Sequence, residues 1–408
     1  MFNVRIRSEC AGDAGQPVSL PSLSVRPSKG QVIRVAFWDK ALSITGSSYP
    51  RLPSPAKYAG FMAHPFQAHP AQAHPAQVHP APAHAGPPLL PSLDQIRRAQ
   101  AVVYRHMPPT PQFTWPLLNQ RLETEAWIKH ENHSPVGAFK LRGALVYIDW
   151  LKQTQPNLTG VVAATRGNHG QGVGMAARLA GLRAVIVVPH GNSTEKNRAM
   201  LAQGAELVEH GQDFQESLEF ARRLAIDRNF SLIDSFHERL VMGTATYALE
   251  FLEAAPPLQS VYVPIGLGSS IGGVSAARNA LKLQTEVVGV VAAASPSYAL
   301  SFAQHKIVEA RSGTAIADGL ACRIPNGEAM EIIWQNVARI VEVTDEEIAQ
   351  AMRAYYQDTH NLAEGAGAAA LAGALKEVRQ RNDQRIGIIL TGGNVDQQTY
   401  AKVLAGNG

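Results

Sequence analysis

Short runs rich in valine and isoleucine alternate with helix-like stretches from about residue 92 onward, and this alternation restricts the fold more than any other feature. Apolar runs of this length are typical of strands buried on both faces. When helices separate such strands, the chain forms a parallel, doubly wound α/β architecture. The strands are expected at 158–165, 183–189, 205–210, 231–235, 260–266, 285–293, 339–343 and 385–392.

The stretches between these runs predict helices. The first, 92–106, is amphipathic and has Ser92 or Asp94 near its start, where an oxygen acceptor can cap free backbone N–H groups. The others are expected at 173–181, 193–204, 214–228, 243–255, 272–283, 344–359 and 365–380.

Residues 1–91 have a different composition and hold 14 of the 26 prolines. Between Ala63 and Pro87 a degenerate five-residue repeat places histidines at 64, 69, 74, 79 and 84. Proline removes backbone donors and fixes φ, so we expect a disordered extension. The histidines indicate either low-complexity sequence, which we favour, or metal binding. The apolar stretch Gln31–Trp38 has no evident partner, and Met62 is an alternative start.

Charge and cysteine content limit the function. Residues 1–90 carry eight basic and three acidic residues, so the net charge of +4 leaves the remainder at −1. We therefore expect no nucleic-acid partner. No apolar run reaches the length of a membrane helix, so no membrane span is expected. Cys10 and Cys322 cannot form a disulfide framework, and no signal peptide is evident, which favours the cytoplasm.

Glycine-rich turns follow three of the expected strands. The clearest, Gly266–Gly273, comes after a strand and opens a helix, where small residues and free N–H groups favour a phosphate. It lacks the Gly-Lys-Ser/Thr of a nucleoside-triphosphate loop. The next strand ends in alanine and serine without the acid that a dinucleotide site needs. The alternative is a tight turn with no ligand.

A second segment, in which Lys140 follows a turn and opens a helix, carries more information. His130–Ala144 reads HENHSPVGAFKLRGA, and it closely resembles the lysine segment of the pyridoxal-phosphate-dependent serine/threonine dehydratase family, of fold type II. Ala138 stands where the family commonly has serine. Further motifs follow in the family's order: Gly167–Gly172 (GNHGQG), the glycine turn, Ala317–Ala321 (ADGLA) and Thr391–Asn394 (TGGN).

The resemblance implies a role for each matching residue. Lys140 is expected to bind pyridoxal 5'-phosphate as a Schiff base and to move the α-proton. Phe139 is expected to pack against the cofactor, Asn168 to bind its 3-hydroxyl, and Thr391 to face its ring nitrogen. The backbone around Gly167 and His169 is expected to bind the substrate carboxylate. The expected phosphate-binding residues are Gly266, Leu267, Gly268, Ser269 and Ser270.

Two positions depart from the family. Arg166 stands where a small residue is usual, and an arginine that stays protonated cannot serve as the second acid/base of a racemase. It either contacts the substrate's carboxylate or acidic side chain, or forms an ion pair at the rim of the site. Ser295 and Ser301 stand where some relatives carry carboxylates for a cation, so we expect no metal.

We therefore predict a carbon–nitrogen lyase that converts a β-hydroxy L-amino acid, first L-threonine or L-serine, to a 2-oxo acid and ammonia. Phenylserine or 3-hydroxyaspartate is the alternative substrate. The alternative to an enzyme is a non-catalytic protein that binds the cofactor. The family implies two open-sheet domains, a cofactor in the cleft between them and a homodimer. The large domain is expected at 92–134 and 236–408 and the small one at 135–235, after the extension 1–91.

Overall fold

A computed structural model describes residues 23–25, 33–35 and 90–406 of the chain. The chain divides into two units between Val78 and His79, and every described residue other than the two short N-terminal strands lies in the second. Those strands, β1 (Leu23–Val25) and β2 (Ile33–Val35), pair antiparallel. The expectation that the apolar stretch Gln31–Trp38 has no partner is therefore wrong. The rest of the predicted extension as far as residue 89, including the histidine repeat, lies outside the described residues.

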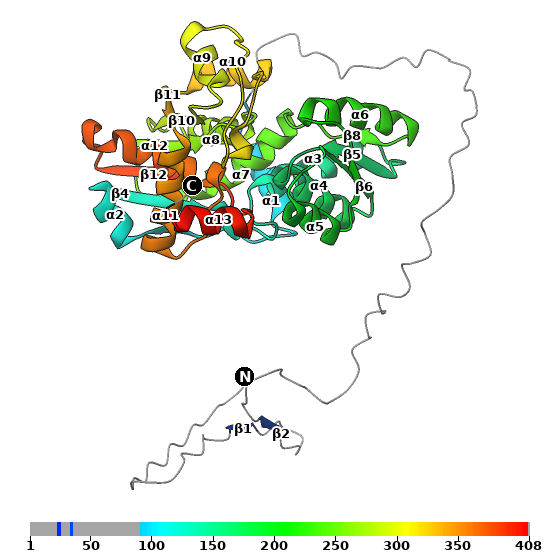
Figure 1. Cartoon of the computed structure of the whole chain (residues 1–408), viewed down its shortest axis with the longest axis horizontal. Helices are drawn as coiled ribbons and strands as arrows, with labels where there is room; N and C mark the ends of the chain where they lie inside the picture. The colour runs from blue at the N-terminus through cyan, green and yellow to red at the C-terminus, as the bar shows by residue number, and fades with distance from the viewer. Residues whose placement is uncertain (1–22, 26–32, 36–89, 407–408) are drawn as a thin grey trace. The chain divides into compact units, whose positions relative to one another are not determined.

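Two sheets organise the second unit, and every strand expected from the sequence is present in one of them (Figure 1). The six-stranded sheet has the order β11-β10-β9-β12-β4-β3, parallel except for the edge strand β3. The four-stranded sheet has the order β7-β6-β5-β8 and is parallel throughout. The strands are β3 (Gln112–Thr114), β4 (Glu125–His130), β5 (Gly160–Ala164), β6 (Arg183–Val188), β7 (Glu206–Glu209), β8 (Ser231–Leu232), β9 (Ser260–Pro264), β10 (Glu286–Ala292), β11 (Arg339–Val343) and β12 (Arg385–Leu390).

Helices cover both faces of each sheet, which is why the strands are apolar without alternation. On the four-stranded sheet, Val161 and Ile186 pack toward α3 and α4, whereas Val162 and Val185 pack toward α6. The helices of this region are α3 (Lys140–Thr154), α4 (Asn168–Leu179), α5 (Thr194–Ala202) and α6 (Phe214–Asp227).

The six-stranded sheet is covered in the same way, with α12 on one face and α8 on the other. Helices α1, α3 and α7 pack on one another and lie between the two sheets (Figure 1). The remaining helices are α1 (Leu93–Val103), α2 (Pro116–Leu122), α7 (Glu238–Ala254), α8 (Ser269–Ala280), α9 (Ser297–Gln304), α10 (Gly327–Asn336), α11 (Asp345–Thr359), α12 (Gly365–Arg381) and α13 (Gln397–Leu404).

The sequence prediction of an α/β fold is confirmed, and so is the first helix start. Ser92 caps α1, its hydroxyl accepting from the Gln95 N–H while the Gln95 side chain accepts from the Ser92 N–H. The strands β3 and β4 and the helices α2, α9, α10 and α13 were not predicted. Across the described residues, no helix is both long and apolar enough to span a membrane.

Candidate active site

The segment before Lys140 is attached to the loop that follows β12. The Phe139 N–H donates to the Thr391 carbonyl at 3.0 Å, and Ala138 forms an antiparallel bridge with Gly392. Because β12 and β4 are neighbours in the sheet, the two segments that leave their carboxyl ends meet there. These bonds set the point at which α3 begins, and Lys140 is its first residue.

The environment of Lys140 makes its amine reactive. The side chain is half-buried, and Nζ lies 4.9 Å from the centre of the Phe139 ring. Burial lowers the pKa of Lys140 to about 8, although the nearby Glu364 carboxylate opposes this shift. A substantial fraction of the amine is therefore neutral near neutral pH, as attack on an aldehyde requires.

The helix α4 brings a second expected residue to the same place. A Cβ on Gly172 would lie 3.1 Å from the Lys140 carbonyl, so a larger residue would push α4 away from α3 by a few tenths of an ångström. Asn168, at the start of α4, accepts from Asn394 Nδ2 at 2.8 Å and donates to Glu364 Oε1 at 2.5 Å. The donor Nδ2 retains one further N–H for a ligand.

Glu364 is a site residue that the sequence reasoning missed. It is buried immediately before α12, and burial raises its pKa above the ordinary value although Lys196 and the Asn168 amide oppose this. The available signal was an acidic residue directly before a glycine- and alanine-rich helix. The Glu364 side chain makes no capping bond to α12, and its carboxyl group accepts from the Asn168 amide instead.

The expected phosphate loop connects β9 to α8. Gly268 has φ +98° and caps α8, and a Cβ on it would lie 2.5 Å from Ala329 Cβ. A Cβ on Gly266 would lie 2.4 Å from the Gly319 carbonyl oxygen. Ser269 and Ser270 are buried in the first turn of α8, and Leu267 packs partly against the core. Small residues, hydroxyls and a helix N-terminus are the donor set that an anionic phosphate prefers.

The three residues expected to bind substrate differ in exposure. His169 is buried, Nε2 has no hydrogen-bond partner among the described residues, and burial lowers its pKa to about 3. The Gly167 N–H donates to the Thr165 hydroxyl at 3.1 Å. The Arg166 side chain is 45% exposed. His169 is therefore neutral, whereas Arg166 is a half-exposed cation at this end of β5.

Arg166 faces a carboxylate from the other sheet region, together with a lysine that the sequence reasoning missed. Arg166 Nη1 lies 3.9 Å from Asp318 Oδ1, and Lys196 Nζ lies 3.6 Å from Asp318 Oδ2. Neither contact is short enough for a hydrogen bond. Lys196 also lies over Gly167, since a Cβ there would be 2.7 Å from Lys196 Cδ. Two cations thus share one half-exposed carboxylate, and the cluster carries a net positive charge.

The serines at the family's cation position are engaged within the protein. The Ser295 and Ser312 hydroxyls are 3.0 Å apart, and the Ser301 hydroxyl accepts from the Val308 N–H at 2.9 Å. Within the described part of the chain, no cluster of three or more His, Cys, Asp or Glu side chains could hold a metal ion.

The lysine with a lowered pKa, the glycine cradle that side chains would fill, and the unpartnered buried nitrogen of His169 together fit a phosphorylated pyridine aldehyde. Residues 103–392 match the family of pyridoxal-phosphate dependent enzymes. The chain belongs to this family, and its cofactor is pyridoxal 5'-phosphate.

Curated relatives narrow the comparison. The chain is 30% identical over 319 residues to an L-threo-3-hydroxyaspartate ammonia-lyase of Saccharomyces cerevisiae, covering 78% of this chain and 98% of that protein. It is 35% identical over 299 residues to a Pseudomonas enzyme of the same name, covering 73% and 93%. An L-threonine ammonia-lyase of Thermotoga maritima is 30% identical over 314 residues, covering 77% and 78%.

Solved structures agree with the fold. A pyridoxal 5'-phosphate-dependent aspartate racemase superposes with a TM-score of 0.73 at 28% identity, covering 77% of this chain and 99% of that one. Threonine deaminase isoform 2 from Solanum lycopersicum superposes with a TM-score of 0.72 at 26% identity, covering 77% and 94%. The prediction of a serine/threonine dehydratase-like enzyme of fold type II is confirmed.

Proposed function

We propose that the protein is an ammonia-lyase that converts a β-hydroxy L-amino acid to a 2-oxo acid and ammonia. The observation that carries this proposal is Lys140, an amine of lowered pKa at the start of α3, held opposite the loops that present Asn168 and Thr391. The relatives named as 3-hydroxyaspartate and threonine ammonia-lyases support the reaction class.

Bound pyridoxal phosphate withdraws electrons from the substrate's α-carbon and makes its proton removable. Lys140 would hold the cofactor covalently and, once released, accept that proton at Nζ. Phe139 would pack against the cofactor, and Asn168 would donate its remaining amide N–H to the ring hydroxyl. The Thr391 hydroxyl would face the ring nitrogen, which it cannot keep protonated as an aspartate would. This moderated electron demand suits β-elimination, the loss of the β-hydroxyl.

The other predicted residues would bind the cofactor's phosphate and the substrate's carboxylate. Gly266, Gly268 and Ser269 would bind the phosphate, with Leu267 and Ser270 beside them. The backbone from Arg166 through Gly167 to His169 would bind the substrate carboxylate, where the neutral His169 adds no charge. The large and small domains would correspond to the six- and four-stranded sheet regions, with the boundaries predicted above.

L-threonine and L-serine are the substrates we propose first. The cluster of Arg166 and Lys196 around Asp318 favours a second candidate, a β-hydroxy amino acid with an acidic side chain, because its net positive charge lies beside the proposed carboxylate loop. The test is release of 2-oxo acid from L-threonine, L-serine, L-threo-3-hydroxyaspartate and L-threo-phenylserine, compared by kcat/KM. Release from none of the four would overturn the proposal. If the absorbance of the bound cofactor stays unchanged when each amino acid is added, the protein is a non-catalytic binding protein.

Lys140 provides the sharpest control. Lys140→Ala should abolish turnover while the protein stays folded. In the wild-type protein stripped of cofactor, the rate of reconstitution should rise with pH through a midpoint near 8, because the amine is protonated below that pKa and neutral above it. A rate independent of pH between 6.5 and 9 would contradict the proposed state of Lys140.

We also propose a cytoplasmic homodimer. The cytoplasm is favoured by the low cysteine content of the sequence, and the dimer by the family resemblance. Light scattering on the purified protein tests the dimer, since a monomeric mass would exclude it.

A further inference from the structure

Helix α7 lies between the lysine helix α3 and the helix α8 that begins at the phosphate loop, and it carries one side chain that reaches both. Tyr247 is fully buried. Its hydroxyl lies 2.7 Å from Ser270 Oγ and 3.4 Å from the Ser270 carbonyl oxygen. Its ring meets the Phe139 ring edge-on, with 6.2 Å between the ring centres. One side chain thus contacts the residue before Lys140 and a residue of the proposed phosphate loop.

The bond between Tyr247 and Ser270 joins two hydroxyl groups, and either of them can donate its hydrogen. The Ser270 carbonyl oxygen is a second, more distant acceptor for the Tyr247 hydrogen. Burial raises the pKa of Tyr247 well above its ordinary value, so the hydroxyl stays protonated and remains a donor. When Tyr247 donates to Ser270 Oγ, the Ser270 hydroxyl keeps its own hydrogen for another acceptor.

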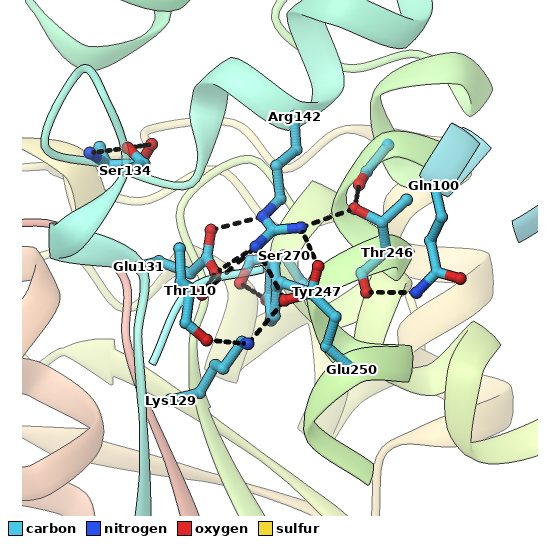
Figure 2. Close-up of polar contacts among 12 residues, drawn as sticks. Gln100, Thr110, Lys129, Glu131, Ser134, Arg142, Thr246, Tyr247, Glu250 and Ser270 are labelled. Atoms are coloured by element: carbon cyan, nitrogen blue, oxygen red, sulfur yellow. Dashed lines mark hydrogen bonds and ion pairs between the residues drawn. The ribbon is translucent and has the colours of Figure 1, made fainter. Parts of the chain in front are cut away.

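The ring of Tyr247 is held in place by a buried ionic network (Figure 2). The Arg142 guanidinium carbon lies 5.9 Å from the centre of the Tyr247 ring. Arg142 in turn contacts Glu131 at 2.8 Å and Glu250 at 2.6 Å, and all three side chains are buried. A guanidinium held by two carboxylates presents a fixed face to the ring, so Tyr247 has little freedom to turn.

A second bond from α7 reaches the same loop. The Thr244 hydroxyl donates to the Ser269 carbonyl at 2.7 Å. The backbone of the first turn of α8 is therefore attached to α7 independently of Tyr247. Loss of the Tyr247 hydroxyl alone would leave this turn in place and change only the state of the Ser270 hydroxyl.

We propose that Tyr247 is a positioning residue for the phosphate end of the cofactor: its ring is held by contacts with Phe139 and Arg142, and its hydroxyl donates to Ser270 Oγ and so directs the Ser270 hydroxyl toward the phosphate. This inference rests on the proposed cofactor site. It assigns Tyr247 no contact with the substrate or with Lys140 itself.

The test compares Tyr247→Phe with the wild-type protein, using pyridoxal phosphate added back after removal. Tyr247→Phe should weaken the dissociation constant about tenfold, which corresponds to about 1.4 kcal/mol. The ³¹P resonance of the bound phosphate should also shift. The matched control is Tyr355→Phe, because Tyr355 is equally buried but its hydroxyl has no hydrogen-bond partner among the described residues. That control should change neither quantity.

A double-mutant cycle with Ser270→Ala separates positioning from packing. If Tyr247 acts through the Ser270 hydroxyl, Tyr247→Phe should have almost no further effect once that hydroxyl is gone. Additive losses, or an unchanged dissociation constant and ³¹P resonance in Tyr247→Phe, would overturn the inference. A wild-type protein that fails to bind pyridoxal phosphate would instead overturn the proposed function.

Discussion

Two ionic clusters of the protein differ in burial. Lys129, Glu131, Arg142 and Glu250 are at most 6% exposed, and their ion pairs are 2.6 to 2.8 Å long. In the other cluster, Arg166 and Asp318 are 45% and 47% exposed, Lys196 is 14% exposed, and the contacts are 3.6 and 3.9 Å. The buried charges are balanced two against two, whereas the exposed cluster has an unbalanced cation.

The difference shows what each arrangement can do. Buried charges have lost their water, so each depends on its partners and the network holds one geometry. It joins β4, α3 and α7, the elements that set the position of Lys140. The exposed charges remain partly solvated and loosely paired, so an anionic ligand can compete for them. One cluster therefore serves the scaffold and the other is available for recognition.

The largest expected effect comes from breaking the buried cluster. Arg142→Met leaves Glu131 and Glu250 without their main counter-ion, and removal of one partner from such a network costs about 3–5 kcal/mol of unfolding free energy. Urea denaturation measures it. The control is Arg105→Met, which removes an exposed pair with Asp149 and should cost under about 1 kcal/mol. Equal losses in the two variants would remove the distinction between the clusters.

A smaller loss, about 2 kcal/mol, is expected for Glu250→Gln at neutral pH. Burial raises the pKa of Glu250, but the pairs with Arg142 and Lys129 outweigh it and leave the pKa below its ordinary value. The carboxylate therefore stabilises the fold at neutral pH, and this contribution is lost as pH falls below the unfolded value toward the folded one. The stability gap between wild type and Glu250→Gln should narrow in acid. A gap that widens in acid would reverse the assigned sign.

The exposed cluster should affect substrate choice more than stability. If an acidic substrate is used, Arg166→Ser or Lys196→Gln should lower kcat/KM for L-threo-3-hydroxyaspartate relative to L-threonine about tenfold, or about 1.4 kcal/mol. Arg166→Ser should change the unfolding free energy by under about 1 kcal/mol, because its ion pair is exposed. An equal loss of kcat/KM for both substrates would indicate that the cations bind the α-carboxylate, which the two substrates share. An unchanged kcat/KM for both would indicate that the cations only form a structural ion pair at the rim of the site.

Salt should produce the smallest effect. Between 0.1 M and 1 M ionic strength the screening length falls from about 10 Å to about 3 Å, so exposed charges weaken while buried ones are little affected. The preference for an acidic substrate should fall about twofold to threefold over this range, measured as a kcat/KM ratio. The stability cost of Arg142→Met should stay constant. A preference that is independent of salt would argue against recognition by the half-exposed Arg166.

Most strands of the two sheets could be predicted from local sequence, but the buried charges could not. Continuous apolar runs predicted eight strands because burial on both faces leaves no place for polar residues. The edge strand β3 and its neighbour β4 were missed, since EAWIKH in β4 mixes polar and apolar residues. The burial of the charged residues Lys129 and Glu131 is explained by their partners: Lys129 pairs with Glu250, 121 residues away, and Glu131 pairs with Arg142.

The sequence by itself determined the α/β architecture, the glycine turn before α8 and the lysine that opens α3, because these depend on periodicity, turn chemistry and a local motif. The tertiary structure alone decided which distant groups meet: Glu364 with Asn168, Tyr247 with Ser270, and Lys196 with Asp318. Such contacts depend on how α12, α7 and α5 pack, and packing geometry is not encoded in any short stretch of residues. Burial then decides which charges are fixed and which stay available.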